Sequence, residues 1–384
     1  MHPEHPNSTG ISAEFGSMGA GVHDPVHRRV GHRSERNRGV SARPECVNPS
    51  LRLRNTEPVD GQYGCHPTRT LEAPHGFPTV GAISSDRVAI FGREGYAFLF
   101  GGSTGYFSLY GRRGREYVAE YWCGLLERRQ NRYAAHAPVV SLFVPNKTTC
   151  LPDLYPVALP SRELDFFAEL HRLQARNPTA LFGDALRRLS QAPMREVEPT
   201  WKFADTHWTS TGTIHTLNEV LGAFGLAPVP VSLEVVEPRR DWGDLTARWP
   251  DSPMVDWIRA RYRTDLPDPV LEFDLLPPGV TPTVVSGRRI TWRNPDAAID
   301  AHLLVVGNSF CGPATDQCQL NWWFGRIFRK VTFVHSGSIP SDTVERVKPD
   351  LIFFQQVERF LPTYPDDSLT LADIELSYTS RLPN

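Results

Sequence analysis

The sequence "HLLVVGNSF", residues 302–310, joins an uninterrupted apolar run to a Gly-Asn-Ser ending. Such a run suits a strand that is buried on both faces, and glycine, asparagine and serine are typical of the turn that ends it. Helical spacing follows over 319–330 and 340–349, and short apolar strands are predicted over 331–335 and 351–357. Strands alternating with helices in this way predict an α/β fold with a mostly parallel sheet.

The region upstream of this unit contains further regular elements. Apolar and aromatic residues alternate between glycines over 87–102, which predicts a hairpin. Residues 117–133 have helical spacing, and an apolar run over 137–147 predicts a buried strand. Two more amphipathic helices are predicted over 161–176 and 213–225.

Composition divides the chain into a tail, a folded domain and a second tail. Residues 1–75 are rich in Pro, Gly, Ser, His and Arg, so they are expected to form a disordered or poorly ordered tail. The folded domain is expected over 76–365, with a Pro-rich insertion over 228–295. Residues 366–384 are expected to form a C-terminal tail.

Charge and composition exclude several classes of protein. A formal net charge of −2 in 384 residues gives no basic field for nucleic acid, so no nucleic-acid partner is expected. The six cysteines lack the paired spacing of a zinc site. No apolar segment is long enough to span a membrane, and no signal peptide is recognised. The chain as written is therefore expected in the cytoplasm, or in the periplasm or outside the cell if the true N-terminus differs.

Ser309 is the candidate nucleophile because active sites in parallel sheets gather at the carboxyl ends of strands. A serine in such a turn can project its hydroxyl while neighbouring N–H groups face the same volume. The alternative is that Gly-Asn-Ser is only a strand-ending turn. Cys311 competes for the nucleophile position, but no local base favours it, and Cys311 and Cys318 could instead form a disulfide.

A serine nucleophile needs a base and a group that orients the base, and the segment "WKFADTHWTSTGT" (201–213) supplies Asp205 and His207. Residues two apart cooperate only outside a helix, and the Thr-Ser-Thr run after them is suited to cap a helix that begins later. The alternatives are a polar turn with a core histidine, or a metal site that adds His215.

Six motifs occur in the order seen in the AlgX/AlgJ family of SGNH-hydrolase-like O-acetyltransferases, which the sequence resembles over about residues 90–361. The motifs are "GREGYAFLF" (92–100), "VPNK" (144–147), "DTHW" (205–208), "WGDL" (242–245), "VVGNSF" (305–310) and "DLIFFQQVER" (350–359). The resemblance implies a flavodoxin-like three-layer SGNH-type fold in which Asp205, His207 and Ser309 form the catalytic triad. Asn308 stands where the family has aspartate. Backbone N–H groups of Ser309 and Phe310 are expected to bind an oxyanion, with Asn308, Trp208 and Gln356 as further candidate oxyanion or substrate contacts.

The sequence therefore predicts a serine-dependent O-acyltransferase, with O-acetyl transfer to a hydroxyl of a glycan or glycosylated small molecule. An esterase with the same triad and a non-catalytic glycan-binding protein are the alternatives. No cofactor is expected, since the chain has no Gly-rich phosphate loop and no basic cluster for coenzyme A. The family resemblance implies an acyl donor delivered by a membrane partner.

Overall fold

The computed structural model describes residues 76–101, 112–157, 179–191, 198–241, 243–249, 252, 256–281 and 285–382. These residues belong to one compact unit. The tail predicted over 1–75 and the helix predicted over 161–176 lie outside them. Among the described helices, none combines the length and apolar character that crossing a membrane requires.

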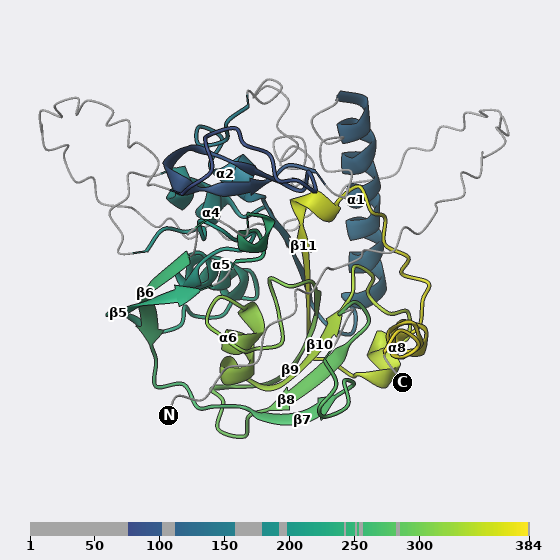
Figure 1. Cartoon of the computed structure of the whole chain (residues 1–384). Helices are drawn as coiled ribbons and strands as arrows, with labels where there is room; N and C mark the ends of the chain where they lie inside the picture. Colours follow the sequence, from purple (N-terminus) through teal and green to yellow (C-terminus); the bar gives the residue numbers. More distant parts are fainter. Residues whose placement is uncertain are drawn as a thin grey trace, which may run out of the picture. The chain divides into compact units, whose positions relative to one another are not determined.

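A seven-stranded sheet forms the centre of the structure, in the order β4-β3-β11-β9-β10-β8-β7 (Figure 1). Its strands are β3 (Val139–Val144), β4 (Ala180–Leu181), β7 (Val270–Asp274), β8 (Arg289–Arg293), β9 (Ile299–Gly307), β10 (Phe328–His335) and β11 (Leu351–Val357). The pairings from β4 to β10 are parallel, and β8 and β7 continue the sheet antiparallel. The predicted mostly parallel α/β sheet is confirmed.

Helices cover both faces of this sheet, which gives three layers (Figure 1). One face packs against α5 (Ser210–Ala223) and α6 (Leu320–Ile327), and the other packs against α1 (Arg112–Tyr133) and α8 (Leu371–Thr379). Strand residues alternate between the two cores, so Val305 belongs to the α5/α6 side while its neighbours belong to the α1/α8 side. This double burial explains why β9 is apolar without interruption.

Shorter elements surround these layers. They are the hairpin β1 (Ala89–Phe91) and β2 (Ala97–Leu99) with η1 (Arg93–Gly95), the antiparallel ribbon β5 (Ser232–Asp241) and β6 (Asp256–Arg263), the helices α2 (Lys147–Cys150), α4 (Asp184–Gln191) and α7 (Thr343–Arg346), and the turns η4 (Thr246–Arg248) and η5 (Glu358–Phe360). The hairpin predicted over 87–102 is present.

Two predicted boundaries differ from the structure. The Pro-rich insertion contributes β7 and β8 to the central sheet; β7 is an edge strand with exposed positions, so it lacks the apolar run of a buried strand. The predicted C-terminal tail contains α8, which opens with a capping box between Thr370 and Asp373 and buries Leu371, Ile374 and Tyr378. Three apolar residues in a short helix are a weak sequence signal. They are enough to hold α8 in place once the sheet offers a surface on which they can be buried.

Candidate active site

The turn after β9 is held by the side chain and backbone of Asn308. Its Oδ1 accepts from the Phe310 N–H at 3.2 Å, and its Nδ2 donates to Oε1 of Gln356 at 3.0 Å. The Asn308 N–H donates to Oε1 of Gln355 at 3.1 Å. These bonds tie the turn to the neighbouring strand β11 and fix the backbone on both sides of Ser309 at the carboxyl edge of the sheet.

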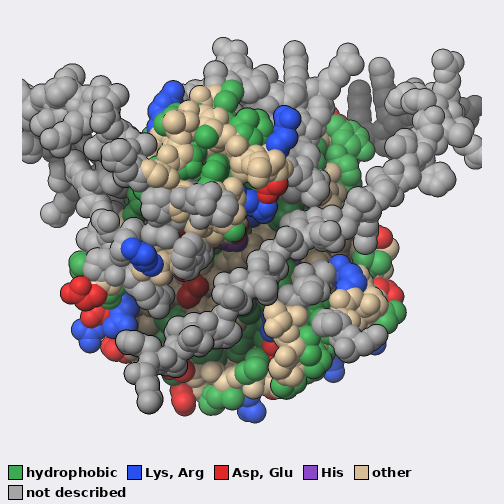
Figure 2. Space-filling view, viewed as in Figure 1, with side chains coloured by type: hydrophobic (Ala, Val, Ile, Leu, Met, Phe, Trp, Pro, Cys, Tyr) green, Lys and Arg blue, Asp and Glu red, His purple; other side chains and the backbone are tan. Residues whose placement is uncertain are grey.

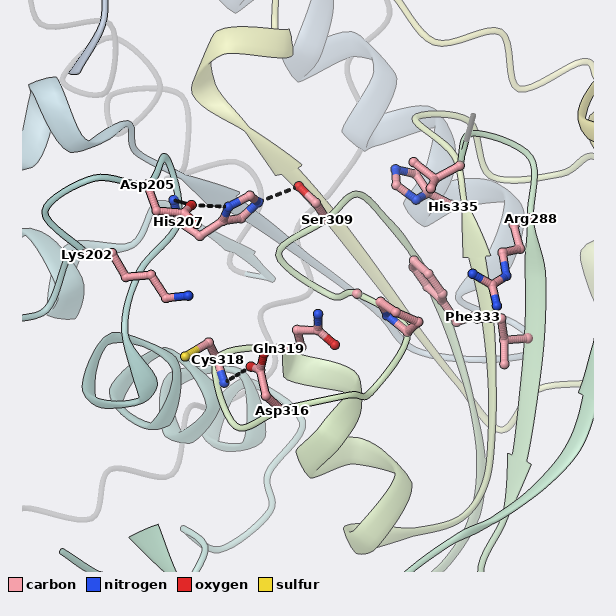
Figure 3. Close-up of a pocket in the computed structure, with 14 residues that line it drawn as sticks. Lys202, Asp205, His207, Arg288, Ser309, Asp316, Cys318, Gln319, Phe333 and His335 are labelled. Atoms are coloured by element: carbon pink, nitrogen blue, oxygen red, sulfur yellow. Dashed lines mark hydrogen bonds and ion pairs between the residues drawn. The ribbon is translucent and has the colours of Figure 1, made fainter. Parts of the chain in front are cut away.

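Ser309 is hydrogen-bonded to His207, which is hydrogen-bonded to Asp205 (Figure 3). The Oγ of Ser309 lies 2.7 Å from Nε2 of His207, and Nδ1 of His207 lies 2.6 Å from Oδ1 of Asp205. The same Oδ1 also accepts the backbone N–H of His207 at 2.8 Å. An acid, an imidazole and a hydroxyl are thus aligned in the order that activates a serine.

The loop that carries Asp205 and His207 ends where α5 begins. Trp201 and Trp208 form an isolated antiparallel bridge, so the residues between them make a tight extended turn. Thr209 is the N-cap of α5 and accepts the N–H of Gly212. The predicted non-helical placement of the Asp-x-His pair is therefore what the structure shows.

Gly243 and Asp244 brace this loop from the side. A Cβ on Gly243 would lie 2.0 Å from the carbonyl oxygen of Ala204, so only glycine permits this approach. The Asp244 N–H donates to Oδ2 of Asp205 at 3.3 Å, and its Oδ1 accepts the Thr206 N–H at 2.7 Å. The "WGDL" motif was noticed in the sequence, but Asp244 was not predicted as a site residue.

Lys147 is a buried cation beneath the same loop. Its Nζ donates to the carbonyl oxygens of Ala97 and Lys202, both at 2.7 Å, and of Phe203 at 3.2 Å. The side chain is only 4% exposed, and burial lowers the pKa of Lys147 to about 8 although nearby carboxylates favour the charged form. Lys147 therefore holds the hairpin strand β2 against the residues that precede Asp205.

Replacing Lys147 with methionine is expected to lower the free energy of unfolding by ~2–4 kcal/mol, because the carbonyl oxygens of Ala97 and Lys202 lose this donor and that of Phe203 keeps only the Ala97 N–H. Urea denaturation measures this loss. The matched control is Lys330→Met, since the Lys330 side chain is 37% exposed and its Nζ lies 3.4 Å from Oε1 of Glu272. That control should change the free energy by no more than ~0.5 kcal/mol. Equal changes in the free energy of unfolding for the two substitutions would contradict the role of Lys147 in holding β2 against the residues before Asp205.

Asp256 holds the same residues through their N–H groups. Its carboxylate accepts from the N–H groups of Phe203 and Ala204, the latter at 3.0 Å. Burial raises the pKa of Asp256 to about 6, against the opposing effect of the Lys147 charge. Carbonyl and N–H groups just before Asp205 are thus fixed by two buried side chains of opposite charge.

The raised pKa of Asp256 predicts a pH dependence of stability. Between pH 3.8 and about 6 the unfolded chain releases a proton that the folded protein keeps, so this group makes stability fall as pH rises. The fall is at most ~3 kcal/mol. Urea denaturation from pH 4 to 6.5 should show it as the difference between the wild type and Asp256→Asn, because His302 and His335, whose pKa values burial lowers to about 4, make the stability of both proteins rise with pH over this range. Parallel stability curves for the two proteins would show that Asp256 titrates normally.

Asp205 is held in its charged form. Burial alone raises the pKa of Asp205, but the charge and hydrogen bonds of His207 and the charge of Lys202 outweigh burial and hold the pKa below its ordinary value. The carboxylate is therefore available at neutral pH to orient the imidazole and to stabilise its protonated form.

A cavity of about 240 Å³ opens beside the Ser309 hydroxyl. Figure 2 shows this face of the molecule hollowed at its centre, with hydrophobic side chains in the hollow. Lys202 and Asp316 lie on one side of the cavity, and Phe333, His335 and Arg288 on the other (Figure 3). None of these five residues was predicted from the sequence, because they come from separate parts of the chain with no shared motif.

The side chain of Trp208, which was expected as an oxyanion or substrate contact, is buried in packing, and so is the ring of Phe310, which was expected to contribute its backbone N–H. Both side chains are fully buried, and the Trp208 Nε1–H donates to the carbonyl oxygen of Cys318 at 2.7 Å. The Phe310 ring lies 4.8 Å from the His207 ring and 4.7 Å from the Trp208 ring, so it supports the imidazole from behind. Asn308 and Gln356 are also buried and stabilise the turn of Ser309.

The two expected oxyanion donors differ in whether their N–H groups are already hydrogen-bonded. The Phe310 N–H is bound to Oδ1 of Asn308, so it is not free for an oxyanion. The Ser309 N–H has no acceptor among the described residues and remains the candidate donor.

The positions of the side chains bear on two alternatives for this region: a disulfide between Cys311 and Cys318, and a metal site that adds His215. Cys311 and Cys318 are both free thiols, so the disulfide considered from sequence does not form. Near the site, the described residues Asp205, His207 and Asp244 have potential metal-ligand atoms within 4.8 Å of one another. His215 is not part of this group.

Similar folds are found among solved structures. The chain is similar to the O-acetyltransferase domain of AlgJ from Pseudomonas putida, with 18% identity and a TM-score of 0.45 over 75% of this chain and 99% of that domain. It is also similar to PatB1 from Bacillus cereus with a sulfonyl adduct, with 9% identity and a TM-score of 0.48 over 73% and 99%. AlgX from Pseudomonas aeruginosa gives 12% identity and a TM-score of 0.40 over 75% and 66%. No protein-family model and no curated protein matches the sequence.

Proposed function

We propose that the protein is a serine-dependent O-acyltransferase. The observation that carries the proposal is the unbroken chain of hydrogen bonds from Asp205 through His207 to Ser309, at 2.6 and 2.7 Å, beside an open cavity. A hydroxyl so placed can lose its proton to the imidazole as it attacks a carbonyl carbon.

In the first half of the reaction, Ser309 Oγ bonds to the carbonyl carbon of an acyl ester and His207 Nε2 takes the hydroxyl proton. The Ser309 N–H stabilises the negative charge that develops on the carbonyl oxygen. The bond from carbon to the leaving oxygen then breaks, and His207 returns the proton to the leaving alcohol. An acyl ester of Ser309 remains.

In the second half, a hydroxyl of the acceptor takes the place of the leaving alcohol. His207 removes its proton, the acceptor oxygen bonds to the acyl carbon, and Ser309 leaves with the proton from His207. The sequence resemblance to the AlgX/AlgJ family makes a glycan hydroxyl the proposed acceptor. It also makes a membrane partner the proposed source of the acyl group.

The choice between transfer and hydrolysis is tested by measuring where the acyl group goes. The enzyme is incubated with 4-nitrophenyl acetate, with and without neutral and uronate oligosaccharides, and free acetate and acetylated sugar are quantified by mass spectrometry. Acetylated sugar that forms in proportion to the released phenol supports a transferase. Free acetate alone at every acceptor concentration would make the protein an esterase, and no phenol release would remove the serine chemistry altogether.

A further inference from the structure

The cavity beside Ser309 has an apolar floor. Phe333 on β10 pairs with Ile290 on β8, and the two side chains lie side by side on the sheet face that carries α5 and α6. Each is 2% exposed and both line the cavity, while Val285 and Pro313 line its mouth. The proposed acyl transfer uses none of these four residues, neither the two on the floor nor the two at the mouth.

Arg288 and His335, which line the same side of the cavity as Phe333, carry no unpaired charge. The Arg288 guanidinium is bound to both carboxylate oxygens of Asp274, with its Nε 2.9 Å from Oδ1. Burial lowers the pKa of His335 to about 4, so the imidazole is neutral at physiological pH. Among the described residues, this wall therefore carries no net charge beside the nucleophile.

The opposite side of the cavity is polar. Lys202, whose Nζ lies 2.8 Å from Oδ2 of Asp241, lines this side together with Asp316 and Gln319. Figure 3 shows Lys202 and Asp316 across the cavity from Phe333, with Gln319 between Ser309 and Asp316. The two sides suit two different parts of a reaction: hydroxyl groups of an acceptor would find partners on the polar side, whereas an alkyl chain would be desolvated on the apolar side.

We propose that the apolar side is an acyl-chain pocket and that the preferred acyl group is longer than acetyl. The inference rests on the proposed acyl transfer at Ser309. A methyl group fills roughly the ~30 Å³ that one water occupies, which is small beside a cavity of about 240 Å³. A butanoyl or hexanoyl chain on Ser309 would place more apolar surface than an acetyl group in the cavity that Phe333 and Ile290 line.

The test compares 4-nitrophenyl acetate, butanoate and hexanoate on the full-length wild type. The rate of acyl-enzyme formation is taken from the pre-steady-state burst and divided by the rate of spontaneous hydrolysis of the same ester in buffer, which corrects for the reactivity of each ester. Each buried methylene should raise kcat/KM for acylation about fourfold until the floor is reached. Acetate as the fastest ester would overturn the inference and leave the proposed function intact. Acylation by none of the three esters would overturn the proposed function.

Two variants locate the effect. Ile290→Phe fills the floor and should reduce the preference for butanoate over acetate from roughly 15-fold to about onefold. The matched control is Thr291→Val, which lies next on β8 and faces the other side of the sheet, where it contacts Thr332. It should keep the wild-type preference. If thermal unfolding shows that Ile290→Phe is not folded, Val285→Trp narrows the mouth from a position that is 44% exposed. An unchanged preference in a folded variant of either kind would refute the pocket.

Discussion

Ser309→Ala is expected to abolish the covalent acyl-enzyme and to lower kcat by ~10⁴-fold or more. The Oγ of Ser309 ends the aligned chain of Asp205, His207 and Ser309 and lies beside the cavity, with the imidazole placed to take its proton. Alanine leaves the imidazole and the cavity in place but removes the nucleophile. Intact-protein mass spectrometry after incubation with an activated acyl ester measures the result directly.

The control for this experiment is a serine outside the site. Ser190 donates its hydroxyl to the Leu186 carbonyl oxygen at 2.7 Å within α4, so Ser190→Ala should retain full acylation. Ser309→Ala should unfold at nearly the wild-type urea concentration, since only one part-buried hydrogen bond is lost, worth ~1 kcal/mol. Full labelling of folded Ser309→Ala would place the nucleophile elsewhere in the chain.

The strands of the parallel sheet were predictable where the sequence carries an uninterrupted apolar run. The strands β3, β9 and β11 are apolar because each is buried on both faces, so their sequence alone identifies them. The edge strand β7 and the short helix α8 escaped this criterion. Their burial depends on surfaces supplied by other elements, and a local pattern does not contain that information.

Within the site, the residue types were predictable and their supports were not. A histidine two positions from an aspartate, with a serine at a strand end, was enough to suggest the triad. The contacts of Lys147 with Lys202 span 55 positions, and those of Asp256 with Ala204 span 52. Only the folded chain brings such residues together, so the roles of Lys147 and Asp256 in holding the residues before Asp205 could not be predicted from the sequence.

Asn308, at the position where the resemblance noted from the sequence led us to expect aspartate, fits its surroundings as an amide. Its Nδ2 donates to Oε1 of Gln356, and its Oδ1 accepts the Phe310 N–H. A carboxylate could accept but not donate, and it would face the Gln356 oxygen without a proton. Asparagine at position 308 is therefore matched to Gln356 on β11 by this hydrogen bond, and the hydrogen bond between His207 and Ser309 is present beside it.

His207→Ala is expected to reduce the acylation rate by an amount similar to Ser309→Ala, ~10⁴-fold or more, because the serine then has no base. The imidazole is 24% exposed and packs against the Phe310 ring at 4.8 Å. Its removal should leave a flat slot that is open to solvent on one edge. Added imidazole should enter this slot and restore part of the activity, with a saturable dependence on its concentration.

Rescue by imidazole separates a chemical function of His207 from a structural one. A variant that had lost only packing would regain stability with any flat ligand, but it would not regain a pH-dependent rate that follows the titration of imidazole. The control is His136→Ala, an exposed residue after α1, which should keep full activity and should not respond to imidazole. Undiminished acylation by folded His207→Ala would show that the 2.7 Å contact between His207 and Ser309 does not serve proton transfer.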